Sequence, residues 1–214
     1  MRMQISAALP DVLVENNCFL NVAKTAQYWE VIDNGSTVSG SSVWSGGYLD
    51  TDGELSLASK PNVTVARFLF NLAAATGIYK AGYSNAGKVF FVEWDGAATC
   101  TRYLFSGTSS ISTINANKVQ ITFGSSGEGN VGVSFAISDV NNPPRNIRIY
   151  ETQFAANVAA GEIFRPDWLA IVRQFKRIRL LDWIRTNSSN ITDYAQIADE
   201  AYYRWTKVSG GAYG

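Results

Sequence analysis

The sequence contains no histidine, and this absence narrows the possible functions more than any residue that is present. Histidine is the usual general base near neutral pH and the commonest metal ligand in proteins. Its absence excludes Ser-His-Asp and Cys-His catalysis, and it also excludes the ordinary zinc sites. The sequence also shows no other complete catalytic constellation, and we expect this chain to carry no catalytic residue, no metal ion and no cofactor.

Cysteine is also scarce, because Cys18 and Cys100 are the only two in the chain. They lie too far apart in the sequence to form a CxxC motif. They form one disulfide if the first predicted helix packs beside the sheet edge near Cys100, and otherwise they remain two buried thiols. Both alternatives are open at this point.

The chain has no excess of charge and no long apolar run. Lys and Arg number 18 and Asp and Glu number 18, so the formal net charge is zero and no nucleic acid partner is expected. No apolar run is long enough to span a bilayer, so we expect no membrane insertion. The first residues lack the pattern of a signal peptide, and we expect synthesis in the cytoplasm without one.

Residues 33–150 have the composition of a β domain. Short segments rich in β-branched and aromatic residues alternate with turn signals such as Asp52-Gly53 and Asp95-Gly96 at roughly ten-residue spacing, which is typical of an antiparallel sandwich of the jelly-roll kind. The predicted strands are Leu55–Leu57, Val63–Leu72, Gly77–Tyr83, Val89–Trp94, Thr99–Phe105, Val119–Phe123, Gly132–Ile137 and Ile147–Tyr150.

Residues 1–32 are predicted to form an arm followed by a helix. Asn16 or Asn17 is a suitable N-cap, and the helix is expected to continue to about Trp29. The Gly- and Ser-rich residues from Asp33 to Gly47 are expected to form a loop.

Residues 151–214 are predicted to form a helix–strand–helix appendage. Pro166 suits the first position of a helix, and the apolar run Ile178–Trp183 is typical of a buried strand. A last helix is expected from Thr192 to Trp205. A helix that leads into a buried strand resembles one unit of a β/α-barrel, and about thirty further residues are too few to close such a barrel.

Several segments resemble a family of phage- and prophage-encoded proteins described as putative cellulose-binding or glycoside-hydrolase-like. In that family an N-terminal helix and a carbohydrate-module-like β-sandwich precede a β/α-barrel. The segments that carry the resemblance are Asn21–Trp29, Gly47-Tyr48, Val65–Phe70, Gly87–Gly96, Lys118–Gly124, Ser138–Ile149 (SDVNNPPRNIRI), Gly161–Pro166 and Leu181–Ser188 (LDWIRTNS).

The resemblance implies that Leu180–Trp183 is the first strand of a barrel, with Asp182, Trp183 and Asn187 near its substrate-facing end. A carboxylate beside an indole suits a sugar subsite, whereas the structural alternative places Trp183 in the core and pairs Asp182 with an arginine. Family members extend for hundreds of residues beyond the position of Gly214. We therefore expect either the N-terminal piece of a longer protein or a chain that has kept the sandwich and lost the barrel.

Two further groups of residues are candidates for binding. The aromatic residues that a sandwich either presents to carbohydrate or packs in its core are Trp29, Trp44, Tyr48, Trp94 and Tyr103. Trp44 lies in a Ser/Gly-rich segment and is the best surface candidate among them. Glu93 and Asp95 alternate around Trp94, so both side chains face the same side of a strand, as a cation site, an acid/base pair or simply a solvated face.

Two further charged segments, one acidic and one basic, can be explained by structural roles as well as by binding. Asp50, Asp52 and Glu54 alternate beside Gly53, which suits either a weak calcium loop or a solvated turn. Arg145 and Arg148 are expected to tie the sandwich to the C-terminal segment through Glu151 or Glu162.

The leading functional hypothesis is a virion structural or interaction protein of a phage tail, fibre or capsid surface, located in the virion. Its expected partners are other virion proteins and further copies of itself in a homo-oligomer, with host surface polysaccharide as an additional contact. The alternatives are the N-terminal portion of a glycoside hydrolase, which needs two opposed carboxylates, and a free carbohydrate-binding protein.

Overall fold

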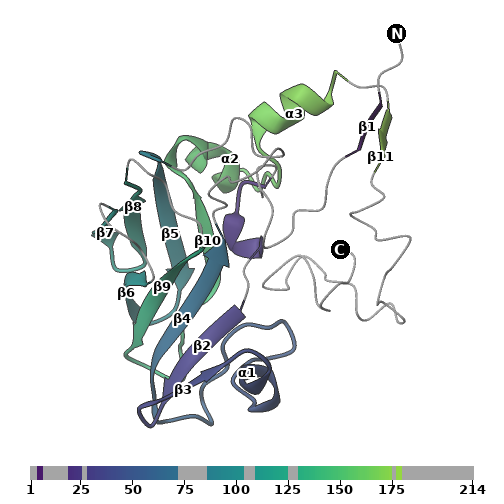
Figure 1. The fold of residues 1–214 in the computed structure, drawn as a ribbon. Helices are drawn as coiled ribbons and strands as arrows, with labels where there is room; N and C mark the ends of the chain where they lie inside the picture. The colour runs from purple at the N-terminus through teal and green to yellow at the C-terminus, as the bar shows by residue number, and fades with distance from the viewer. Residues whose placement is uncertain are drawn as a thin grey trace.

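The computed structural model describes residues 4–6, 19–25, 28–71, 86–103, 109–124, 130–174 and 177–179. Within these ranges the chain is mainly β, with two antiparallel sheets and few helices (Figure 1). The larger sheet has five strands in the order β3-β2-β4-β9-β6. These strands are β2 (Tyr28–Asp33), β3 (Ser36–Ser39), β4 (Val63–Asn71), β6 (Ala98–Tyr103) and β9 (Asn130–Ile137).

The smaller antiparallel sheet has four strands in the order β10-β5-β8-β7. They are β5 (Val89–Asp95), β7 (Ser110–Asn115), β8 (Lys118–Thr122) and β10 (Arg145–Glu151). Strand β5 is an inner strand, because it pairs with β8 on one side and with β10 on the other. Segments that are distant in the sequence therefore flank β5.

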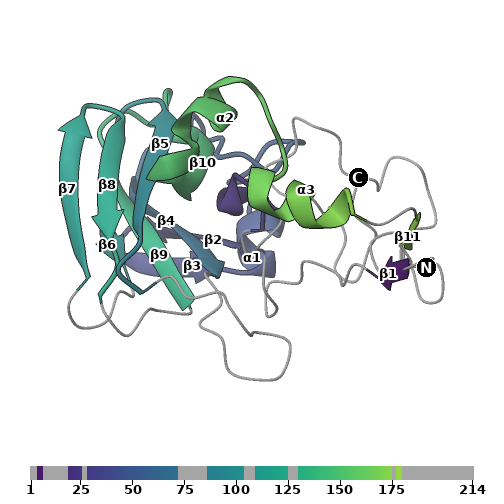
Figure 2. The ribbon, with the colours of Figure 1, turned by 90° about the horizontal axis from the view of Figure 1, so that it is seen from above.

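The two sheets form two layers around one hydrophobic core (Figure 2). Strand β5 buries Phe90, Val92 and Trp94, which alternate with half-buried or exposed residues. The Trp94 ring meets the Phe135 ring of β9 edge-to-face, with ring centroids 5.3 Å apart. Aromatic pairs of this kind add to the free energy gained by burial, so this contact fixes one sheet against the other.

The N-terminal helix that the sequence predicts from Asn16 or Asn17 to about Trp29 is wrong at both of its described ends. Among its described residues, Val22–Thr25 form the 3-10 turn η1, whereas Phe19 forms a β-bridge with Phe164 and Tyr28 already begins β2. Asn34 and Gly35 both have positive φ and form a two-residue turn from β2 into β3. Such turns match the twist of paired strands, so the predicted loop over Asp33–Gly47 contains a hairpin strand, followed by helix α1 (Ser41–Ser45).

The predicted strands of residues 63–150 are largely confirmed, from β4 to β6 and from β8 to β10. Leu55 forms only an isolated bridge with Leu49, and the sequence missed β7. The strand predicted over Gly77–Tyr83 lies outside the described residues, and the jelly-roll topology therefore stays a prediction. Cys100 is a buried free thiol whose pKa is raised by burial, while Cys18 also lies outside the described residues.

The chain after β10 continues as η2 (Thr152–Phe154), α2 (Ala155–Ala159) and α3 (Pro166–Val172), and Pro166 is the first helical residue as predicted. Strand β11 (Arg177–Arg179) pairs in parallel with β1 (Gln4–Ser6). The last predicted helix, Thr192–Trp205, lies outside the described residues. None of the described helices has the length and apolar character that crossing a membrane requires.

A buried ion pair joins this C-terminal segment to the end of β10, where a lysine next to β5 binds the same carboxylate. The Glu151 carboxylate accepts hydrogen bonds from Arg165 Nη1 at 3.0 Å and from Lys88 Nζ at 3.1 Å. The prediction that Arg145 and Arg148 bind Glu151 or Glu162 is therefore wrong. Arg145 pairs with Asp50, and Arg148 pairs with Glu93 and Asp95, because the register of β10 on β5 places Arg148 opposite Glu93.

The contact between the sheets gives a stability prediction. Replacing the fully buried Phe135 by alanine should lower the free energy of unfolding by about 3–5 kcal/mol, because it removes apolar contacts and leaves a cavity under Trp94. The matched change Ile114→Ala, at a side chain that is 51% exposed, should cost less than about 0.5 kcal/mol. Urea unfolding followed by tryptophan fluorescence measures both, and equal losses would contradict the shared core.

Candidate functional site

The outward face of β5 carries the residues of the candidate site. Because Phe90, Val92 and Trp94 point into the core, Phe91, Glu93 and Asp95 point outward from the same strand. The strand register places Glu93 opposite Lys118 of β8 and opposite Arg148 of β10. Glu93 therefore lies between two cations that the neighbouring strands supply.

Glu93 is held as an anion. It accepts hydrogen bonds from Lys118 Nζ at 2.7 Å, from the Tyr150 hydroxyl at 2.8 Å and from Arg148 Nε at 3.3 Å. Burial alone raises the pKa of this carboxyl, but the hydrogen bonds from Lys118 and Tyr150 and the nearby positive charge outweigh burial, so the pKa is lowered. A carboxylate in this state accepts hydrogen bonds and does not donate a proton.

An aromatic pair supports the same network from one side. The Phe91 and Tyr150 rings meet edge-to-face with centroids 5.9 Å apart, and Lys118 Nζ lies 3.7 Å from the Phe91 centroid. Burial and the hydrogen bond to Glu93 raise the pKa of the Tyr150 hydroxyl, so it remains a proton donor. The Lys118 ammonium covers the Phe91 ring, which is consequently not an open stacking platform.

A hollow of about 500 Å³ opens beside this network. Its lining residues are Glu93, Trp94, Asp95, Gly96, Asn115, Asn117, Lys118 and Arg148. The two acids and two bases among them cancel in formal charge, and two amides add neutral donors and acceptors. We call this feature the β5 hollow.

The turns at the rim of the β5 hollow are fixed by close contacts. Asn117 donates from Nδ2 to the Gly96 carbonyl at 2.7 Å, and its own backbone N–H is bound by Asn115 Oδ1 at 2.9 Å. Gly96 has φ +102, and a Cβ there would lie 2.2 Å from the Pro143 carbonyl oxygen. The Asp95-Gly96 turn therefore needs glycine, and it leaves Asp95 with a side chain that is 62% exposed.

A buried carboxyl lies next to this rim. Glu54 is 8% exposed; its Oε1 accepts the Asn146 backbone N–H at 3.1 Å, and its Oε2 has no hydrogen-bond partner in the part of the chain that is described. Burial raises the pKa of Glu54 to about 7, although the Asn146 bond and the positive charges of Arg145 and Lys24 oppose the increase. Glu54 thus titrates near neutral pH.

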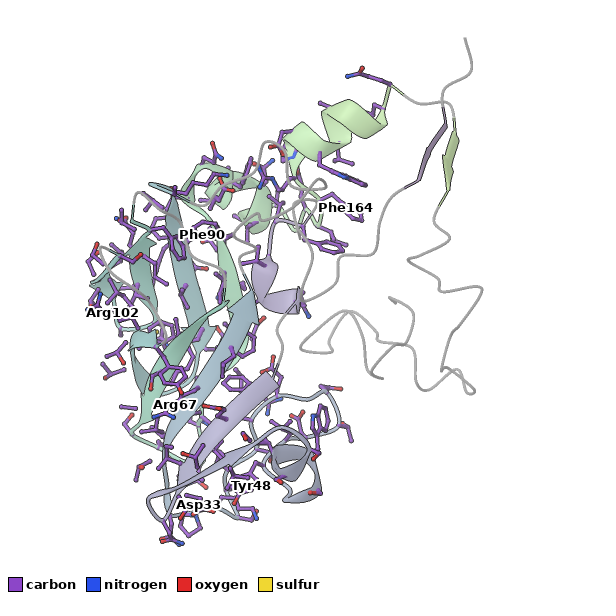
Figure 3. All side chains as sticks on the ribbon, in the orientation of Figure 1. Asp33, Tyr48, Arg67, Phe90, Arg102 and Phe164 are labelled. Atoms are coloured by element: carbon purple, nitrogen blue, oxygen red, sulfur yellow. The ribbon has the colours of Figure 1, made fainter. Side chains whose placement is uncertain are left out.

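Of the two predicted carbohydrate-binding aromatics that lie close together in the sequence, Trp44 and Tyr48, only Trp44 is exposed. Trp44 lies on α1 and is 39% exposed. Tyr48 is buried, its hydroxyl donates to Asp33 Oδ2 at 2.7 Å, and Lys60 Nζ lies 4.5 Å from its ring centroid (Figure 3). The hydrogen bond to Asp33 is the largest cause of the raised pKa of Tyr48. The ring supports α1 and offers no open face.

The remaining sequence candidates are not brought to the β5 hollow as stacking platforms. Asp182, Trp183 and Asn187 lie outside the described residues. Trp29 belongs to the core, as does Trp94, whose ring packs on Phe135. Tyr103 packs under the Arg67 guanidinium on the other sheet, with 4.3 Å from Arg67 Cζ to the ring centroid (Figure 3 labels Arg67).

The acidic turn at Asp50–Glu54, which the sequence offered as a calcium loop, uses its Asp50 carboxylate to accept hydrogen bonds from the protein itself. Asp50 Oδ1 accepts the backbone N–H groups of Asp52 and Glu54, and Asp50 Oδ2 accepts from Arg145. Across the described ranges no group of three His, Cys, Asp or Glu side chains is arranged to hold a metal ion. The carboxyl groups of Asp50 and Glu54 are thus used in fixing the loop to the start of β10.

The sequence identified Glu93 and Asp95 but missed the rest of the hollow. Lys118 and Arg148 reach it only through strand pairing, and this pairing leaves no local signal. Asn115 and Asn117 carried a signal that was available, because closely spaced asparagines are typical of tight turns.

Comparisons with known proteins give no assignment. No family model, curated protein or solved structure matches this chain.

The buried Glu54 gives a prediction on stability against pH. The pKa of Glu54 is about 7 in the folded protein and 4.5 in the unfolded chain, so the folded state binds the Glu54 proton more tightly. The stability that this proton contributes is complete below pH 4.5 and is lost as the pH rises through about 7. Relative to Glu54→Gln, wild type should therefore lose up to roughly 3 kcal/mol between pH 4.5 and 8. Urea unfolding over this range tests it, with Asp52→Asn as the control that keeps the wild-type profile. Parallel profiles for wild type and Glu54→Gln would show that Glu54 ionises normally.

Proposed function

We propose that this chain is a non-catalytic contact module of a phage virion, and that it holds glycan in the β5 hollow while other surfaces dock to virion proteins. The observation that carries the glycan part is the polar lining of the hollow, with acids, bases and amides on one outward sheet face. Sugars present many hydroxyl groups that both donate and accept hydrogen bonds, and this lining offers matching groups of both kinds.

The charges of the hollow support a neutral glycan. Glu93 and Asp95 oppose Lys118 and Arg148, and these groups are already joined by ion pairs. An acidic polysaccharide would have to displace Glu93 from both cations, with a large loss of charge-assisted hydrogen bonds. A neutral oligosaccharide needs no such exchange.

The same network supports binding rather than cleavage. A glycosidase requires one carboxylic acid that stays protonated until it protonates the leaving oxygen. The pKa of Glu93 is lowered, so Glu93 is ionised at neutral pH. The side chain of Asp95 is mostly exposed and bound to Asn146 Nδ2 at 2.9 Å. Neither residue therefore has the environment of a general acid.

The virion assignment is supported by the sequence resemblance and by the architecture. We propose that the two sheets form a carbohydrate-module-like sandwich of the jelly-roll kind, because consecutive strands pass repeatedly from one sheet to the other. A shallow polar site binds weakly, and a homo-oligomer in a virion combines several such sites. Light scattering after size exclusion and immunodetection in purified particles test this part. A monomer absent from particles that still binds glycan would instead favour a free carbohydrate-binding protein.

The glycan site predicts a selective loss of binding. Asp95→Ala should weaken binding to a neutral oligosaccharide by about tenfold, because it removes an exposed acceptor at the rim. Asp139→Ala, an exposed acid outside the hollow, is the matched control. Isothermal titration against the strongest neutral ligand of a glycan array measures both. A loss in Trp44→Ala with none in Asp95→Ala would move the site to α1.

One observation favours a second candidate, the N-terminal portion of a glycoside hydrolase. Strands β1 and β11 pair in parallel although most of the chain separates them. Parallel neighbours are characteristic of α/β architectures, as the start of a barrel requires. Under the leading proposal the 214-residue chain releases no reducing sugar from cellulose, xylan or chitin. Release that survives in Asp95→Ala would favour the hydrolase and place its acids elsewhere.

A further inference from the structure

Asn146 connects the buried Glu54 to the rim of the β5 hollow. Its backbone N–H donates to Glu54 Oε1 at 3.1 Å, and its side-chain Nδ2 donates to Asp95 Oδ2 at 2.9 Å. Its carbonyl oxygen accepts from Arg148 Nη1 at 3.2 Å. One residue thus contacts both the buried carboxyl and two members of the hollow.

The bonds that Asn146 makes stabilise an uncommon backbone conformation. Its φ is +48, in the left-handed region that residues other than glycine adopt at a cost. The register between β10 and β5 is irregular at this point, between Arg145 and Arg148. The hydrogen bond to Glu54 is therefore part of what determines where the Asn146 side chain, and with it Asp95, is placed.

Glu54 is itself fixed by its surroundings. Its backbone N–H donates to Asp50 Oδ1 at 3.1 Å, and Asp50 is paired with Arg145 at the start of β10. The charged groups that face the Glu54 carboxyl are Asp50 from its own loop, Arg145 from β10 and Lys24 from η1. Of these, the two cations favour the carboxylate and Asp50 disfavours it.

We infer that Glu54 is a positioning residue for the β5 hollow, which holds Asn146, Asp95 and Arg148 in the binding arrangement as a carboxylate and releases them when protonated. The effect on ligand affinity rests on the proposed function, whereas the movement of Asn146 does not. An N–H bond to a carboxylate is stronger than one to a neutral acid. Protonation therefore weakens the bond that keeps Asn146 in the left-handed region.

The pH range follows from the environment of Glu54. Since its pKa is about 7, the carboxylate predominates at pH 8 and the acid predominates at pH 6. Glycan affinity should therefore rise with pH across neutrality. Loss of one charge-assisted bond corresponds to roughly a fivefold change in affinity.

The first experiment needs no ligand. In the full chain labelled with 15N, the backbone and side-chain amide signals of Asn146 are followed by NMR from pH 5.5 to 8.5. Both signals should shift with a midpoint near 7 in wild type and in the control Asp52→Asn. In Glu54→Gln, which keeps an oxygen acceptor but cannot ionise, the shift should vanish. Asn146 signals that stay constant in wild type, or that still titrate in Glu54→Gln, would overturn the inference.

The second experiment connects the movement to binding, with cellohexaose as the neutral probe. Its affinity should be roughly fivefold higher at pH 8 than at pH 6 in wild type, and equal at both in Glu54→Gln. Equal affinities at both pH values in wild type would reject a positioning role in binding. Absence of cellohexaose binding at every pH, together with an Asn146 titration, would count against the proposed function and leave the coupling of Asn146 to the ionisation of Glu54 established.

Discussion

If strand β5 shifted its register by one residue, its core-facing residues and the residues that line the β5 hollow would change places. Trp94, Val92 and Phe90 fill the space between the sheets, while Glu93 and Asp95 point outward from the same seven-residue strand. A shift of one position would bury both carboxylates against Phe135 and expose three large apolar side chains. The free energy of burying these apolar groups therefore also fixes the position of Glu93 between Lys118 and Arg148. The site is thus a consequence of the core.

Glu93, Glu151 and Glu54 are buried or half-buried, and they differ in the number of hydrogen-bond donors that stabilise their negative charge. Glu93 has Lys118, Arg148 and Tyr150 as donors, and Glu151 has Lys88, Arg165 and Gln153. Removing water from a carboxylate is expensive unless such donors replace it. Glu54 differs, because its Oε1 accepts a single backbone N–H, from Asn146, and its Oε2 has no hydrogen-bond partner within the described residues. Of these three acids, Glu93 and Glu151 are therefore compensated by several donors, whereas the pKa of Glu54 is raised to about 7.

Much of the β structure was predictable from the sequence because its signal is local. Strands such as β5 and β8 alternate apolar and polar residues, and turn residues such as Asp95-Gly96 bound them. Strand β7 was missed because its sequence, SISTIN, is mostly polar and lies at a sheet edge, where little burial is required. The helix predicted to Trp29 failed for another reason. Trp29 and Val31 alternate as strand residues, and the Asn34-Gly35 turn that pairs them with β3 was the stronger signal.

The site was predictable only in part, because strand pairing brings its members together across long stretches of sequence. That Glu93 and Asp95 share a face follows from a period of two and is visible in the sequence. That Lys118 and Arg148 neutralise Glu93 depends on which strands flank β5, and no local pattern encodes that choice.

This difference decides the chemistry. Read alone, two adjacent acids on one strand suggest acid/base catalysis or a cation site. With a lysine and an arginine on the neighbouring strands, the same two acids form a polar surface of zero formal charge. Such a surface offers both donors and acceptors of hydrogen bonds, and the pKa of Glu93 within it is lowered by its donors. The pairing of strands, more than the residues of any one strand, therefore determines what this face can do.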